Sequence, residues 1–337
     1  FSFSFLVRSL FVLLLFPELP FAPPFHPKKV SPRSFRSPKK IISPQHNMFE
    51  AFKDPTTNEW REPVMAFHRS HEELPILAIC VYLYLIFYAD KWVSKPWNCK
   101  GILVMWNLFL AGFSVVGAIY LLPLLWKKIQ QDGFRASVCE SAMWYFDGWE
   151  GVFVTLFIYS KFLELMDTVF LIIRKKEVIF LHWFHHVTVL LFCWHSLHHQ
   201  TACGIWFAAM NYFVHSLMYT YYALAIWGFK PIFTLAPLIT TIQILQMVGG
   251  ITVILSVAYD KIVLGNDCDV QDANWKLGLT MYTSYFILFS ILFYDKYFGK
   301  KDKSKASKPP CFPDHKTDGA GFFHAKEDGR FETKKQN

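Results

Sequence analysis

Three histidines lie close together in an apolar stretch of this 337-residue chain. His182, His185 and His186 are spaced i, i+3 and i+4, so on an α-helix their side chains point the same way from adjacent turns. An imidazole serves as a general base, a nucleophile or a metal ligand near neutral pH. The spacing therefore predicts a catalytic site or a metal site on one face of a helix.

Three other apolar stretches each carry a stripe of polar side chains at helical spacing. Lys161, Glu164 and Thr168 share one face of a helix, and Asp167 lies close beside it. The other two stripes comprise Asn211, His215, Tyr219 and Tyr222, and then Thr240, Gln243 and Gln246. Together with the histidines, these side chains are candidates for one shared site.

The depth of these side chains supports a shared cavity. At about 1.5 Å per helical residue, Asp167 and His185 lie roughly 10 Å from the same end of their helices, and His215 and Gln243 lie roughly 18 Å in. Ionisable groups are costly inside a bilayer, so each marks a paired contact or a site. For the oppositely charged residues of the first stripe, the alternative is an internal ion pair that only neutralises buried charge. For the Asn, Gln and Tyr side chains of the other stripes, the alternative is that they only form hydrogen bonds that hold neighbouring helices together.

A second H-x-x-H-H cluster follows at His195, His198 and His199. Paired histidine boxes resemble membrane desaturases and hydroxylases, which hold two metals about 4 Å apart. Thirteen residues separate the two boxes, or about 20 Å along one helix. The further box that desaturases need is absent from the sequence. We interpret the second cluster as an interfacial group at the lumenal mouth of its helix.

The composition indicates which elements must position these groups. The chain is 53% hydrophobic and only 18% charged, unlike a soluble domain. Its apolar residues form runs long enough to cross the roughly 30 Å core of a bilayer as helices. The seven runs cover about 74–90, 101–126, 149–173, 178–198, 204–227, 231–258 and 275–295. We therefore expect an all-α membrane protein with seven transmembrane helices.

The charge distribution orients the chain. The net charge of +8 does not indicate nucleic-acid binding, because the basic residues lie mainly in the tails and short loops. The basic tail after the last run predicts a cytosolic C-terminus. Cys139 and Cys268 then fall in two lumenal loops, where they could form a disulfide. Cys80, Cys193 and Cys203 lie in or near spans and are interpreted as buried hydrophobic residues.

The chain divides into four segments. Residues 1–47 are expected to be disordered, and are either an extension foreign to the native protein or a targeting segment. Residues 48–73 are expected to be lumenal, and residues 74–298 form the membrane domain. Residues 299–337 are expected to be a disordered cytosolic tail. The tail ends in a dilysine-like retrieval signal at Lys334 and Lys335.

Four ordered motifs carry a resemblance to a known family. They are K-x-x-E-x-x-D-T from Lys161, H-x-x-H-H from His182, N-x-x-x-H-x-x-M-Y-x-Y-Y from Asn211 and T-x-x-Q-x-x-Q from Thr240. In this order they resemble the fatty acid elongases, the condensing enzymes of very-long-chain acyl-CoA synthesis, over roughly residues 48–300. The resemblance implies a seven-helix bundle in the endoplasmic reticulum membrane that encloses an acyl tunnel.

The resemblance also implies an activity and its partners. A long-chain acyl-CoA would react with malonyl-CoA to give a 3-oxoacyl-CoA, CO2 and CoA, without a cofactor or a bound metal. The expected partners are these two substrates, membrane lipid, and the reductases and dehydratase of the elongation cycle. A homodimer is left open. The surroundings of the motifs resemble the subgroup that extends saturated and monounsaturated chains of medium to long length.

The residue types suit this chemistry, which requires an acyl carrier, a carbanion and a stabilised oxyanion. His185 is expected to take the acyl group on its imidazole or to act as a base. His182 and His186 would orient it, and His215 would assist the loss of CO2. The expected substrate-binding residues are Lys161, Glu164, Asp167, Thr168, Asn211, Tyr219, Tyr222, Gln243 and Gln246. The amides among them would donate hydrogen bonds to a thioester or enolate oxygen.

Several alternatives stay open at this point. Arg174, Lys175 and Lys176 could contact the phosphates of CoA or could only determine topology. The three box histidines could form a metal site, as in a histidine-box oxygenase. A seven-helix receptor or transporter would use the buried charges as switch or pathway elements.

Overall fold

The computed structural model describes residues 54–299, all of whose regular elements are helices. The predictions for residues 1–47, for the lysine-rich tail and for the dilysine-like end lie outside this range. The α-helices are α3 (Arg61–Ser70), α4 (Glu73–Tyr88), α5 (Lys100–Cys139), α6 (Gly148–Glu164), α7 (Met166–Ile173), α8 (Phe180–His198), α9 (Gly204–Trp227), α10 (Ala236–Ile262) and α11 (Asp272–Tyr297). The all-α prediction is confirmed for the described residues.

Each of the seven apolar runs falls on one or two of these helices, but not every helix has the length and composition of a membrane span. Three do: α5, residues 230–262 around α10, and α11. A fourth span results if α3 and α4, bent by 59°, count as one. Seven membrane crossings therefore stay a prediction.

Two of the helices that do not qualify as spans, α8 and α9, carry polar stripes, whereas α10 carries one and qualifies. Both α8 and α9 are long enough, and neither contains Asp, Glu, Lys or Arg. Their histidines, tyrosines and tryptophans lower the mean hydropathy instead. The predicted run 149–173 is divided at Leu165 into α6 and α7, so Asp167 lies in the first turn of α7.

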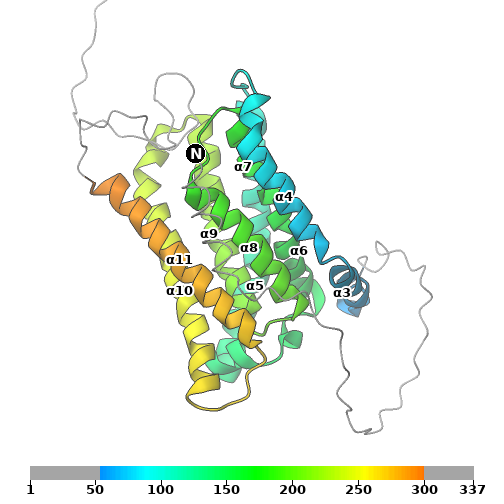
Figure 1. Cartoon of the computed structure of the whole chain (residues 1–337). Helices are drawn as coiled ribbons and strands as arrows, with labels where there is room; N and C mark the ends of the chain where they lie inside the picture. The colour runs from blue at the N-terminus through cyan, green and yellow to red at the C-terminus, as the bar shows by residue number, and fades with distance from the viewer. Residues whose placement is uncertain (1–53, 300–337) are drawn as a thin grey trace, which may run out of the picture.

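The bundle is held together by close helix packing. The long α5 packs along α9, and α10 packs along α11. Gly117 faces the Tyr212 ring and Gly250 faces the Tyr282 ring, where an added Cβ atom would lie within 2.5 Å of a ring carbon. Small residues at such contacts allow neighbouring helices to approach. In Figure 1, α10 and α11 form one flank of the bundle, and α4 lies on the other.

The outward faces of the helices are apolar. Ile102, Met105 and Ile119 of α5 and Leu255 of α10 are at least half exposed. A continuous apolar exterior of this kind suits hydrocarbon rather than water. Cys80 of α4 also faces outward, so the interpretation of this residue as buried was wrong. Cys193 and Cys203 are buried.

A disulfide fixes one end of the bundle. It joins Cys139, the last residue of α5, to Cys268 in the loop between α10 and α11. The Asp269 amide donates a hydrogen bond to the Cys139 carbonyl, and Arg135 forms an ion pair with Asp260 at 2.7 Å. These contacts hold the α10–α11 loop against the end of α5.

Candidate functional site

The polar stripes meet in one cavity of about 1940 Å³, a volume that includes the open space at its mouth. Of the residues expected to act on substrate, Lys161 and Thr168 lie behind the cavity wall. The others line it: Glu164, Asp167, His182, His185, His186, Asn211, His215, Tyr219, Tyr222, Gln243 and Gln246. Five helices from α6 to α10 therefore present these groups to one space.

A buried ion pair supports the floor of the cavity. Lys161 Nζ lies 2.6 Å from Glu164 Oε1 and donates a second hydrogen bond to Asn211 Oδ1 at 3.1 Å. Both charged side chains are at most 5% exposed. Within residues 54–299, Glu164 Oε2 has no hydrogen-bond partner. The ion-pair alternative thus describes a real contact, and this contact also positions Asn211 of the neighbouring α9.

Asp167 connects three helices. Its carboxylate accepts a hydrogen bond from Trp106 Nε1 of α5 at 2.6 Å and one from the Tyr219 hydroxyl of α9 at 2.7 Å. A buried carboxylate is tolerated where its oxygens are hydrogen-bonded. The break at Leu165 places Asp167 where both donors reach it.

Thr168 connects the histidine box to the first long helix. Its hydroxyl lies 2.8 Å from His182 Nε2 of α8 and 2.8 Å from the Tyr82 hydroxyl of α4. The ring centroids of His182 and His186 are 4.6 Å apart. Thr168 therefore lies behind the cavity wall, hydrogen-bonded to a histidine that lines it.

Tyr285 of α11 packs against the central histidine. The ring centroids of His185 and Tyr285 are 4.9 Å apart. The Tyr285 hydroxyl donates to the His185 carbonyl at 3.2 Å and hydrogen-bonds Thr188 at 2.5 Å. The sequence did not identify Tyr82, Trp106 or Tyr285 as site residues. An isolated aromatic residue in an apolar run cannot be told apart from one that only packs in the core.

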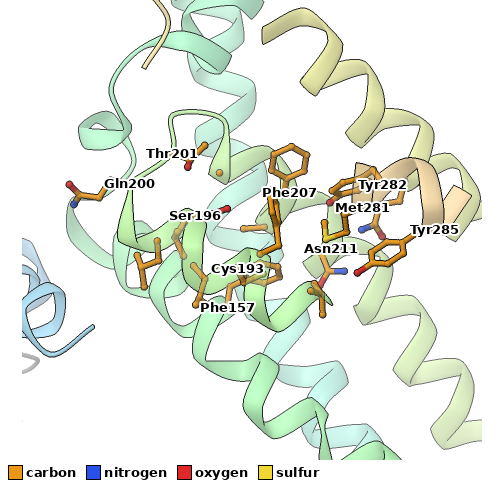
Figure 2. Close-up of a pocket in the computed structure, with 18 of the residues that line it drawn as sticks. Phe157, Cys193, Ser196, Gln200, Thr201, Phe207, Asn211, Met281, Tyr282 and Tyr285 are labelled. Carbon is orange, nitrogen blue, oxygen red and sulfur yellow. The ribbon is translucent and has the colours of Figure 1, made fainter. Parts of the chain in front are cut away.

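A second, smaller cavity adjoins the first and has a volume of about 700 Å³, which again includes open space at its mouth. The two share His185, Asn211, Gln246 and Met247. Figure 2 shows Asn211, Tyr282 and Tyr285 at one end of it, Phe157, Cys193 and Phe207 along its length, and Ser196 and Thr201 at the far end. His185 thus lies where the larger cavity, called the polar chamber because the polar stripes line it, meets the smaller one, called the narrow chamber, which few polar residues line. Apolar atoms make up most of the lining of both chambers.

Basic side chains line the opposite end of the larger cavity. Arg174 and Lys176, which follow α7, line the cavity together with Lys296 of α11 and one acidic residue, Glu177. Lys175 adopts a positive φ of 56° and is not part of the lining. Lys296 was missed in the sequence because it belongs to a lysine-rich segment with no motif.

The second histidine cluster lies outside both cavities. His195 is hydrogen-bonded to Asn274 at 3.0 Å, and His198 lies 3.3 Å from Glu72 of the α3–α4 turn. Burial lowers the pKa of His199, which follows α8, to about 4, so this ring is neutral at pH 7. The structure thus separates this cluster from the histidine box.

Metal-ligating atoms do not converge at the histidine box. Across residues 54–299, the one group of three or more such side chains with ligand atoms within 4.8 Å of one another is Cys139, Asp260 and Cys268. Two of these belong to the disulfide. The side-chain geometry therefore gives no support to the metal interpretation of the box.

The sequence profile of the ELO (GNS1/SUR4) family matches residues 67–305. The chain belongs to this family. It is 38% identical over 263 residues to fatty acid elongase 3 of Trypanosoma cruzi (strain CL Brener), covering 70% of this chain and 88% of that protein. It is 41% identical over 261 residues to fatty acid elongase 3 of Trypanosoma brucei brucei (strain 927/4 GUTat10.1), with 69% and 87% covered. A putative fatty acid elongase 3 of Caenorhabditis elegans is 36% identical over 284 residues, with 81% and 85% covered.

These similarities support a fatty acid elongase. The family match includes every polar stripe that lines the larger cavity. The apolar helices and the family together identify this ELO chain as a multi-pass membrane protein.

A double-mutant cycle tests the buried ion pair of this elongase. Lys161→Met and Glu164→Gln should each lower the free energy of unfolding by about 3–5 kcal/mol, because each leaves one buried charge unpaired. The double variant should lose less than the sum. Thermal unfolding in detergent measures the effect, with Lys276→Met on the exposed surface of α11 as the control. Additive losses would contradict the pairing. If the double variant is stable and active, the ion pair has only a structural role.

Proposed function

We propose that this chain condenses malonyl-CoA with a long-chain acyl-CoA to give a 3-oxoacyl-CoA, CO2 and CoA. This is the first step of the two-carbon elongation cycle, the reaction of a very-long-chain 3-oxoacyl-CoA synthase. The observation that carries the proposal is the position of His185 in the lining of both chambers, where the polar stripes of the larger one give way to the mainly aromatic and aliphatic residues of the smaller one. A long acyl thioester has the same division, with a polar head and an apolar tail that meet at the reacting carbon.

The narrow cavity suits the acyl tail. Its lining is mainly aromatic and aliphatic, and each buried methylene contributes about 0.8 kcal/mol to binding. A tail in this chamber places its carbonyl carbon beside His185.

His185 takes the acyl group in the first half-reaction. Its imidazole nitrogen attacks the thioester carbonyl, the C–S bond breaks, and CoA leaves as a thiolate that gains a proton from solvent. In the second half-reaction the malonyl C–CO2 bond breaks, and its electron pair forms an enolate. The enolate carbon attacks the acyl carbon, and the acyl–nitrogen bond breaks to restore neutral His185.

The neighbouring groups suit the enolate step. His215 lines the polar chamber, and it assists the decarboxylation. The amides of Asn211 and Gln246 lie at the junction of the cavities, where they donate hydrogen bonds to the enolate or thioester oxygen. Gln243 lies farther into the polar chamber, with its amide nitrogen 3.2 Å from Met218 Sδ.

The basic end of the polar chamber suits CoA. Arg174, Lys176 and Lys296 can form charge-assisted hydrogen bonds with its phosphates. Basic residues at one end of a helical bundle also favour the cytosolic side. We place the chain in the endoplasmic reticulum membrane with seven spans, a cytosolic C-terminus, and the reductases and dehydratase of the cycle as its partners.

Removal of the central imidazole tests the proposed reaction. Purified His185→Ala should lose at least about 100-fold in kcat, because no other group at the junction of the cavities can carry the acyl group. Release of labelled CO2 from malonyl-CoA with a panel of acyl-CoAs measures it. His195→Ala, in the separate cluster, should stay within about twofold of the wild type. Absence of CO2 release by the wild type, or full activity of His185→Ala, would refute the proposal. Loss of activity on chelation, with one metal per chain, would favour the metal alternative.

Bulk placed deep in the narrow chamber tests the position of the acyl tail. Ser196 lies about 16 Å along α8 from His185. An extended alkyl chain spans this distance with roughly 13 carbons, because each zigzag C–C bond of about 1.5 Å advances the chain by about 1.3 Å. Ser196→Phe should therefore reduce kcat/KM for longer acyl-CoAs at least tenfold and spare shorter ones. The outward-facing Leu255→Phe serves as the control. An unchanged chain-length profile would place the tail elsewhere.

A further inference from the structure

Helix α4 contributes one buried hydroxyl group to the interior. Of the sixteen residues of α4, only Pro75, Ile79 and Tyr82 are buried. No residue of α4 lines either of the two cavities described here. Figure 1 shows α4 along the side of the bundle. A phenylalanine would fill the space of the Tyr82 ring equally well, so the phenolic hydroxyl requires its own explanation.

The Tyr82 hydroxyl begins a chain of hydrogen bonds that ends on the histidine box. It lies 2.8 Å from Thr168 Oγ1, which lies 2.8 Å from His182 Nε2. Tyr82 is 3% exposed and Thr168 is fully buried, so water does not compete for these contacts. The Tyr82 ring centroid is also 6.3 Å from that of His186. The chain of contacts runs from α4 through α7 to α8.

The direction of these hydrogen bonds follows from the donors. Within residues 54–299, Thr168 is the one hydrogen-bond partner of the Tyr82 hydroxyl. A buried O–H without an acceptor costs about 1–3 kcal/mol, so Tyr82 donates to Thr168. Thr168 has a single proton and then donates it to His182 Nε2. An imidazole nitrogen that accepts a hydrogen bond carries no proton, so neutral His182 is protonated at Nδ1.

We propose that Tyr82 is a positioning residue which, through Thr168, holds His182 in the neutral Nδ1-protonated tautomer. This inference rests on the proposed function of the same site. The lone pair of His182 Nε2 is occupied, so that nitrogen neither attacks a thioester nor takes up a proton. Among the clustered imidazoles, the acyl group is thereby directed to His185. The outermost helix of the bundle thus affects the chemistry without touching the substrate.

Kinetics of a hydroxyl deletion test the inference. Tyr82→Phe keeps the ring and removes the donor, so Thr168 is free to accept from a protonated Nε2. The kcat should fall about tenfold with KM unchanged, because an imidazole held in the wrong tautomer is a poor partner in catalysis. The kcat of Thr168→Val should fall at least as far. The double variant with Tyr82→Phe should have the same kcat as Thr168→Val alone, since both residues act through one chain of hydrogen bonds. Tyr84→Phe, half exposed on the same helix, should match the wild type.

A spectroscopic measurement separates this inference from the proposed function. Nitrogen NMR of protein with labelled histidine, assigned with His182→Gln, should show His182 Nε2 unprotonated in the wild type and partly protonated in Tyr82→Phe. A protonated Nε2 in the wild type would overturn the inference, and so would a Tyr82→Phe variant with wild-type kcat and tautomer. If the wild type releases no CO2 from malonyl-CoA, the proposed function fails, and the NMR spectrum still decides the tautomer.

Discussion

The cost of placing polar groups inside an apolar helical bundle governs this structure. Several charged and hydrogen-bonding side chains near the histidine box depend on partners from other helices, because neither lipid nor packed hydrocarbon can supply one. Lys161 contacts Asn211, Asp167 contacts Trp106 and Tyr219, and Thr168 joins Tyr82 to His182. These contacts fix the rotation of α4 to α9 relative to one another. The hydrogen bonds that offset the cost of burying these polar groups are therefore the same ones that orient the helices around the site.

Alignment of the polar faces produces two different chambers that meet at one point. Apolar side chains of α6, α8, α9 and α11 line the narrow chamber, and the polar stripes line the wide one. His185 lies on the helix that borders both, with Tyr285 packed against its ring. The proposed reaction must bring an apolar tail and a charged carrier to the same reacting carbon, and this arrangement suits that requirement.

Periodicity was sufficient to predict the helices and much of the lining. The i, i+3, i+4 spacing of the histidine box and the offsets around Asp167 translate directly into faces of helices, and the ordered motifs indicate one family. Partners supplied by other helices were not predictable. Tyr82, Trp106 and Tyr285 lie in apolar runs where aromatic residues are common, and their hydroxyl or indole partners are 61 to 97 residues away along the chain. The break at Leu165 was also missed, because no glycine or proline marks it.

The proposed reaction depends on His185, which carries the acyl group where the two chambers meet. The direct measurement is to mix the purified protein with labelled acyl-CoA in the absence of malonyl-CoA, then to quantify free CoA and map the label by peptide mass spectrometry. If His185 carries the acyl group, CoA is released in a burst approaching about one per chain, and the acyl group is found on the peptide that contains His185. No CoA release before malonyl-CoA is added, or a label on another residue, would contradict it.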